Sequence, residues 1–99
     1  MHARVVSIQV RPTDLPEVGR IYTEGVLPVC KGQQGYRGAL LLTEAETGRA
    51  VSITLWESEP DMRAGENSPL FQSQSERVQE LITLPAERTY FRVESLNLP

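Results

Sequence analysis

Apolar and polar residues alternate in the first segment of the chain, residues 3–11, and predict a β-strand. One side of this segment carries Val6, Ile8 and Val10, and the other carries Val5, Ser7 and Gln9. A period of two is typical of a strand with one buried face. Arg11-Pro12 is expected to end the strand, because proline has no N–H group for a neighbouring strand.

A helical pattern follows. Thr13 can cap a first turn that contains residues suited to a helix N-terminus, namely Asp14, Pro16 and Glu17. Apolar residues then recur three and four positions apart, at Leu15, Val18, Tyr22, Val26 and Val29. Gly19 and Gly25 each weaken a helix by about 1 kcal/mol relative to alanine, so tertiary packing must hold it. Pro28 is expected to kink this helix or to end its regular part.

The middle of the chain predicts a β-hairpin followed by two helices. The strands run from Tyr36 to Ala45 and from Arg49 to Ser58, and the turn between them places Gly48 in the left-handed region. Ser58 and Ser68 are each followed within two residues by proline, a pattern that begins a helix. The second helix, which Pro85 ends, is expected to turn five apolar residues inward: Leu70, Phe71, Val78, Leu81 and Ile82.

The last strand is predicted from Glu87 to Ser95, which completes the order β-α-β-β-α-β. This order is typical of the α+β class, with a ferredoxin-like antiparallel sheet and helices on one face. Apolar residues occur on both sides of the strands, so the sequence leaves open which side faces the helices. The uncovered face would contain Val5, Leu40 and Leu42 (or Ala39 and Leu41), and Leu55 or Trp56. On a monomer such an exposed hydrophobic patch would promote association, so we expect a homodimer in which two sheets face each other.

Composition limits the classes of protein that fit. The 99 residues correspond to a single domain over residues 1–99, and 39% hydrophobic with 23% charged residues indicates a globular chain. A net charge of −3 gives no electrostatic reason to expect nucleic acid. Cys30 is the single cysteine, so we expect neither an internal disulfide nor a cysteine-based metal site. No apolar run approaches the ~20 residues of a membrane span or the core of a signal peptide, so we expect a cytoplasmic protein with no membrane partner.

Four short motifs occur in a characteristic order along the chain: Arg11-Pro12, Gly35-Tyr36-Arg37-Gly38, Trp56-Glu57-Ser58 and Ser68-Pro69-Leu70-Phe71. In this order and spacing, the segment from Arg4 to about Val93 resembles the antibiotic biosynthesis monooxygenase family. The resemblance implies paired chains that form a dimeric α+β barrel. It also implies oxidation of quinols or aromatic polyketides by molecular oxygen without metal or flavin, so no cofactor is expected. Other members of that family degrade haem.

The residues that such reactions use are only partly present. Enzymes of this kind often carry a histidine or a second tryptophan nine residues after the tryptophan, a position that is Gly65 here. Haem-degrading relatives need a histidine in the following helix and an asparagine on the first strand, and residues 71–75 and 5–7 contain neither. Haem degradation is therefore not expected. The single histidine, His2, lies at the N-terminus.

Cofactor-free oxygenation asks the protein to bind an aromatic ring, hold its enolate and exclude water. The candidate substrate-binding residues are Trp56 and Tyr22 for stacking, Phe71 for the wall, and Arg63 or Arg92 for a phenolate. A structural interpretation stays open, in which the aromatic residues belong to the core and the arginines are exposed. No residue is assigned as catalytic.

Three functions fit these observations. The first is a cofactor-independent monooxygenase acting on a small aromatic, quinol or polyketide-like substrate. The second is a non-catalytic dimer that binds a small aromatic molecule or has a structural role, and the lack of an internal histidine favours it. The third, an amino-acid-sensing regulatory domain of the same topology, lacks any attached DNA-binding helices.

Overall fold

The computed structural model describes residues 1–99 and contains the predicted β-α-β-β-α-β order. The elements are β1 (His2–Gln9), the 3-10 turn η1 (Pro12–Asp14), α1 (Leu15–Ile21), the π-helical turn η2 (Tyr22–Val26), α2 (Leu27–Lys31), β2 (Tyr36–Glu44), β3 (Arg49–Trp56), α3 (Glu59–Glu66), α4 (Pro69–Gln79) and β4 (Glu87–Arg92). No helix is both long enough and apolar enough to span a membrane.

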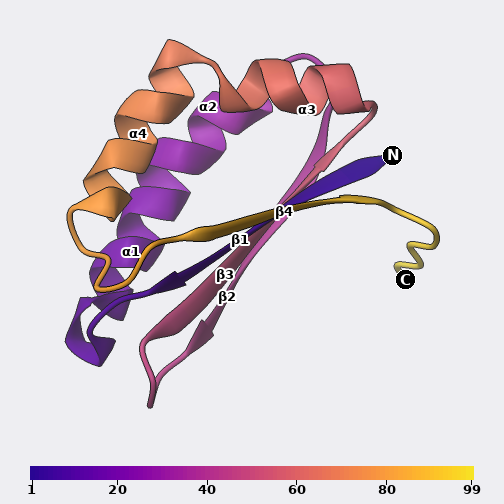
Figure 1. Ribbon diagram of the computed structural model, residues 1–99. Coiled ribbons are helices and arrows are strands. Elements are labelled where there is room, and N and C mark those ends of the chain that lie inside the picture. The colour runs from indigo at the N-terminus through magenta and orange to yellow at the C-terminus, as the bar shows by residue number, and fades with distance from the viewer.

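The four strands form one antiparallel sheet in the order β2-β3-β1-β4, and all the helices lie over one of its faces (Figure 1). This is the ferredoxin-like α+β fold that the sequence predicts. The central strands β1 and β3 pair with Arg4 opposite Thr54 and Val6 opposite Ser52. These four residues therefore share one face of the sheet, and the cavity described below is built on that face.

The structure settles which side of each strand faces the helices. On β1 and β3 it is the even-numbered side, which includes Val6, Ile8, Val10, Ala50 and Trp56, and on β2 it is the side of Ala39 and Leu41. Two clusters fill the space beneath the helices. One contains Ile21, Tyr22, Val26, Cys30 and Phe71, and the other contains Val10, Leu15, Val18 and Ala50.

The opposite face of the sheet is apolar, as the alternation predicts, and no helix covers it. Leu40, Leu42 and Phe91 are 43%, 48% and 52% exposed. Val5 and Leu55 share this outer face, whereas Trp56 points to the helices and is 3% exposed. A single chain therefore leaves a row of large apolar side chains in solvent.

Predicted turns and caps set the ends of several elements. Gly48 has φ +79° in the β2–β3 turn, and a Cβ atom there would lie 2.0 Å from the Val10 carbonyl oxygen. Glycine is therefore required at this position for both its conformation and its size. The Ser68 hydroxyl accepts a hydrogen bond from the Phe71 amide at 3.4 Å and caps α4. Ser58 caps α3 in the same way through the Asp61 amide, at 3.3 Å.

The first helical segment differs from the expectation at its start, and its regular α-helix is interrupted before Pro28. Thr13 lies in η1 and makes no cap, since no side chain caps η1 or α1. The regular α-helix stops at Ile21, passes through the π-helical turn η2, and resumes as α2 until Lys31. The π-helical turn directly precedes Leu27-Pro28. A wider turn at that place accommodates the proline, whose ring crowds the carbonyl four residues earlier and which has no N–H group.

The second helical segment is shorter than expected. α4 ends at Gln79 rather than near Pro85, and Ile82 beyond it forms an isolated β-bridge with Val10. The expectation that Leu70 turns inward is wrong, because its side chain is 69% exposed while that of Phe71 is buried. Neighbouring residues on a helix point about 100° apart, so only one of this pair can face the sheet.

Candidate functional site

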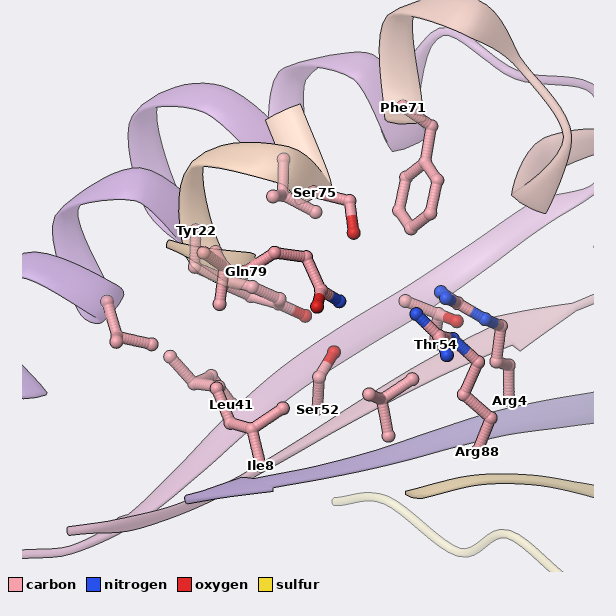
Figure 2. A pocket seen from close by; sticks show the side chains of 14 residues that line it. Arg4, Ile8, Tyr22, Leu41, Ser52, Thr54, Phe71, Ser75, Gln79 and Arg88 are labelled. Carbon is pink, nitrogen blue, oxygen red and sulfur yellow. The ribbon is translucent and has the colours of Figure 1, made fainter. Parts of the chain in front are cut away.

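A cavity of about 70 Å³ lies between the sheet and the helices (Figure 2). Strands β1, β2 and β3 form its floor, and α1, η2 and α4 form its roof. Its apolar lining consists of Val6, Ile8, Val18, Val26, Leu41 and Val78, together with the aromatic residues Tyr22 and Phe71. The neutral polar groups are Ser52, Thr54, Ser75 and Gln79, and the charged groups are Arg4 and Arg88. The cavity is therefore apolar, with positive charge at one end.

Tyr22 enters the cavity from the π-helical turn η2, and Phe71 enters it from the first turn of α4. Each is 7% exposed. The Tyr22 hydroxyl donates to the Leu40 carbonyl at 3.4 Å, and burial raises the pKa of this phenol. Tyr22 is therefore a neutral, oriented ring, and the two aromatic side chains offer walls against which a flat apolar molecule can pack.

Arg4 forms the charged end of the cavity. Its side chain is 8% exposed, and its guanidinium lies over the Phe71 ring, 4.8 Å from the centroid. The Nε atom is buried and makes no hydrogen bond; the nearest carboxylate oxygen, on Glu66, is 3.6 Å away. A buried donor without a hydrogen bond is costly, so this N–H group is available to donate to a ligand oxygen.

Arg88 reaches the same end from the edge strand β4 (Figure 2). It is exposed, and no carboxylate lies within ion-pair distance of its guanidinium. Burial lowers the pKa of Arg4, Glu66 and Tyr90 raise it, and the neighbouring charge of Arg88 lowers it further. The two guanidiniums thus repel each other, and an anion between them would relieve that repulsion.

A network beside the cavity holds Glu66 in place. The Tyr90 hydroxyl donates to the Glu66 carboxylate at 2.5 Å, and this hydrogen bond is the main reason why the pKa of Tyr90 is raised. The Arg63 guanidinium lies 3.9 Å from the centroid of the Tyr90 ring and 3.9 Å from a Glu66 oxygen. Glu66 is therefore shared among several donors, which limits how far it can neutralise Arg4.

A polar vestibule of about 460 Å³ adjoins the cavity. The two spaces share Arg4, Phe71, Ser75, Gln79 and Arg88, so the arginines stand where they meet. The vestibule adds the carboxylates of Glu66 and Glu76 and the amides of Asn67 and Gln72. A molecule entering from this side would meet the guanidiniums before it reached the apolar interior.

The five sequence-predicted binding residues are only partly brought together. Tyr22 and Phe71 line the cavity, whereas Trp56, Arg63 and Arg92 do not. The Trp56 indole N–H donates to the Thr54 hydroxyl at 3.0 Å, which places the ring directly behind a residue of the lining. Arg63 packs on Tyr90, and Arg92 is a largely exposed residue paired with Glu94.

Gly65 on α3 packs closely against the Trp56 ring, which leaves no room for a larger side chain. A Cβ atom at this position would lie 2.7 Å from Cη2 of Trp56 and 2.6 Å from Oε1 of Gln33. The Trp56 ring fills the space next to Gly65. Tyr36 packs against the same ring edge to face, with the two centroids 5.9 Å apart.

Arg4 and Arg88 line the cavity but are not among the residues predicted from the sequence. A signal for Arg4 is present, because it shares its side of the first strand with Val6, Ile8 and Val10, and a charge in such an apolar row is unusual. Arg88 has no comparable signal, since it lies on the edge strand β4, and both faces of that strand carry charged side chains. No group of three or more His, Cys, Asp or Glu side chains is arranged to hold a metal ion.

Comparisons with known proteins agree with this fold. The family model described as antibiotic biosynthesis monooxygenase matches residues 1–82. A comparison with curated protein sequences gave no match. Among solved structures, Rv0793 from Mycobacterium tuberculosis is 20% identical over 96% of both chains, with a TM-score of 0.78. SnoaB, a cofactor-independent oxygenase from Streptomyces nogalater, is 19% identical over 96% of this chain and 94% of its own, with a TM-score of 0.79.

A conserved protein from Methanosarcina mazei is 18% identical over 93% of this chain and 92% of its own, with a TM-score of 0.79. At such low identities these structural likenesses establish the fold, and the family rests on the sequence match over residues 1–82. That match spans well over half of the protein and includes β1, η2 and α4, which build the cavity. The chain belongs to the antibiotic biosynthesis monooxygenase family.

Proposed function

We propose that this protein is a cofactor-independent monooxygenase that acts on a small aromatic, quinol or polyketide-like substrate in the cavity beside Tyr22, Phe71 and Arg4. The observation that carries the proposal is the form of this cavity, with aromatic walls and, at its end, a buried guanidinium N–H group that makes no hydrogen bond. Family membership supports the proposal, as does the fold shared with SnoaB, a cofactor-independent oxygenase.

The residues divide the work as follows. Tyr22 and Phe71 hold the ring of the substrate, and Trp56 supports the cavity from behind through Thr54. Arg4 and Arg88 take the role first assigned to Arg63 and Arg92, and stabilise the substrate once a phenol or enol has lost its proton. A guanidinium in a water-poor site favours the ionised oxygen strongly.

The ionised substrate then supplies the electrons that reduce O₂. One oxygen atom enters the product, and the other leaves as water with the two hydrogens that the substrate loses. The protein's part is to bind the ring, hold the anion and keep bulk water away from the reacting carbon.

We also propose that the active form is a homodimer. The outer face of the sheet exposes Leu40, Leu42 and Phe91, with Val5 and Leu55 on the same face. A second copy would bury this row against its own, and the strands of the two sheets would then enclose a common core. Cytoplasm remains the expected location.

One observation favours the alternative, a non-catalytic dimer that binds a small aromatic molecule. The cavity contains neither histidine nor carboxylate, and burial raises the pKa of Tyr22, so no side chain there is a suitable base near neutral pH. A substrate whose own pKa is low enough to ionise on binding would remove that need.

Oxygen uptake distinguishes the two functions. The wild type is assayed with hydroquinones and anthrones in buffer that contains a chelator, beside the Arg88→Gln and Arg92→Gln variants. The oxygenase proposal predicts uptake above the buffer rate, a loss of at least tenfold in Arg88→Gln, and no loss in Arg92→Gln. Uptake equal to buffer with every compound, while calorimetry detects binding of the same compounds, supports the binding protein instead.

A further inference from the structure

The charged end of the cavity has more donor capacity than one phenolate oxygen uses. The Nε atom of the buried Arg4 makes no hydrogen bond, and Arg88 has no ion-pair partner within reach. The cavity lining contains both guanidiniums and no carboxylate. Figure 2 shows the two side chains converging from β1 and β4 on the space below Phe71. Two planar guanidinium groups that point to the same space can each bind one oxygen of a carboxylate.

The size of the cavity limits the apolar part of the ligand. Its volume of about 70 Å³ is roughly half of the ~150 Å³ in which an engineered protein cavity holds benzene. A single ring could lie partly in the cavity and partly in the adjoining vestibule, because both are lined by Phe71, Ser75 and Gln79. A fused polycycle would have to push α4 away from the sheet.

The surrounding charges favour a single negative charge. Glu66 and Glu76 line the vestibule, so the positive potential of the arginines is partly offset on the side where the ligand enters. Glu66 and Glu76 would repel a dianionic ligand such as a phosphate monoester more strongly than a ligand with a single carboxylate, which has one negative charge.

We propose that the substrates of this site are monocyclic aromatic carboxylates, whose ring lies between Tyr22 and Phe71 and whose carboxylate bridges Arg4 and Arg88. This proposal narrows the substrate class of the proposed monooxygenase. It rests on the proposed function only in assuming that the substrate binds in the same cavity. Arg4 and Arg88 then select substrates by charge, and the aromatic pair selects them by shape.

Calorimetric titration under anaerobic conditions tests the inference without turnover. The full chain is titrated with 2,5-dihydroxybenzoate and with 2,5-dihydroxybenzamide, which has the same shape and no charge. The carboxylate is expected to bind at least tenfold more tightly, the factor that one charge-assisted hydrogen bond supplies. Arg88→Gln should reduce this preference, because only Arg4 then contacts the carboxylate. Arg88 is exposed, so its replacement leaves the core intact, and circular dichroism verifies this.

Arg92→Gln is the matched control, because Arg92 lies on the same strand, is exposed and does not line the cavity. It should keep the tenfold preference. The inference is overturned by equal affinity for acid and amide, by a preference that is undiminished in Arg88→Gln or disappears in Arg92→Gln, or by no binding of either compound at millimolar concentration.

Admitting oxygen afterwards separates this inference from the proposed function. Selective binding of the acid with no oxygen uptake would remove the oxygenase and leave the carboxylate site. Oxygen uptake with hydroquinone and with the acid at equal kcat/KM would remove the carboxylate preference and leave the oxygenase.

Discussion

Replacing Gly65 with alanine should destabilise the protein, although alanine is the better helix former. The new Cβ would lie 2.7 Å from Cη2 of Trp56 and 2.6 Å from Oε1 of Gln33, distances that Cβ atoms in proteins do not adopt. The Trp56 ring on β3 is almost completely buried, so it cannot move freely away from the new atom. Met62, which lies on α3 with Gly65, is also almost completely buried and holds the helix in place.

The expected magnitude follows from two opposing terms. Helix propensity favours alanine over glycine by about 0.8–1.0 kcal/mol. Overpacking of a filled core costs about 1–3 kcal/mol, so the net loss of unfolding free energy is on the order of 1 kcal/mol. For a domain of this size that corresponds to a decrease in Tm of roughly 4–8 °C.

Gly19→Ala provides the matched control. Gly19 lies within α1, and a Cβ there would meet no atom within 4 Å. Only the propensity term applies, and the unfolding free energy should rise by about 0.5–1 kcal/mol. Urea denaturation followed by the fluorescence of Trp56, the single tryptophan, measures both variants at one protein concentration. An equal gain in both variants would show that the Gly65–Trp56 contact is not tight and would refute the reasoning.

Three further predictions concern other parts of the molecule. Leu42→Asp, on the uncovered sheet face, should raise the dimer dissociation constant measured by light scattering at least 100-fold, whereas Leu70→Asp on α4 should remain a dimer. If both variants were monomers, or both dimers, the proposed interface would be contradicted. Ser68→Ala removes the cap of α4 and should cost about 1 kcal/mol in urea denaturation, and an unchanged midpoint would contradict it. Burial raises the pKa of the Cys30 thiol, so the contribution of this thiol to the free energy of unfolding is complete below the unfolded pKa of roughly 8.5 and is lost as pH rises further. Cys30→Ala should therefore reduce the pH dependence of the free energy of unfolding above that value. An equal pH dependence in both proteins would contradict this cause.

The topology could be predicted from the sequence because its signals are local. Period-two alternation marks the strands, and Gly48, Ser58 and Ser68 mark the turn and the helix starts. The π-helical turn before Pro28 could not be predicted, since several backbone geometries accommodate a proline equally well. Sequence also left open which strand face meets the helices, because Leu40 and Leu41 are equally apolar.

The candidate site was only half predictable. Tyr22 and Phe71 are predictable because large aromatic side chains at helical spacing point to the sheet. Residue type alone points to Arg63 and Arg92, but the position of a charge relative to a cavity depends on pairing between distant strands. Arg4 opposite Tyr90 is such a pairing, and it forms only when β4 returns beside β1.

A crystal structure of the protein with bound 2,5-dihydroxybenzoate, obtained without oxygen, would show where an aromatic carboxylate binds. We expect its ring between Tyr22 and Phe71, with its carboxylate in contact with both Arg4 and Arg88. A ligand seated elsewhere, such as the groove between α1 and the edge strand β2 that Leu15, Gly19 and Leu40 line, would contradict it.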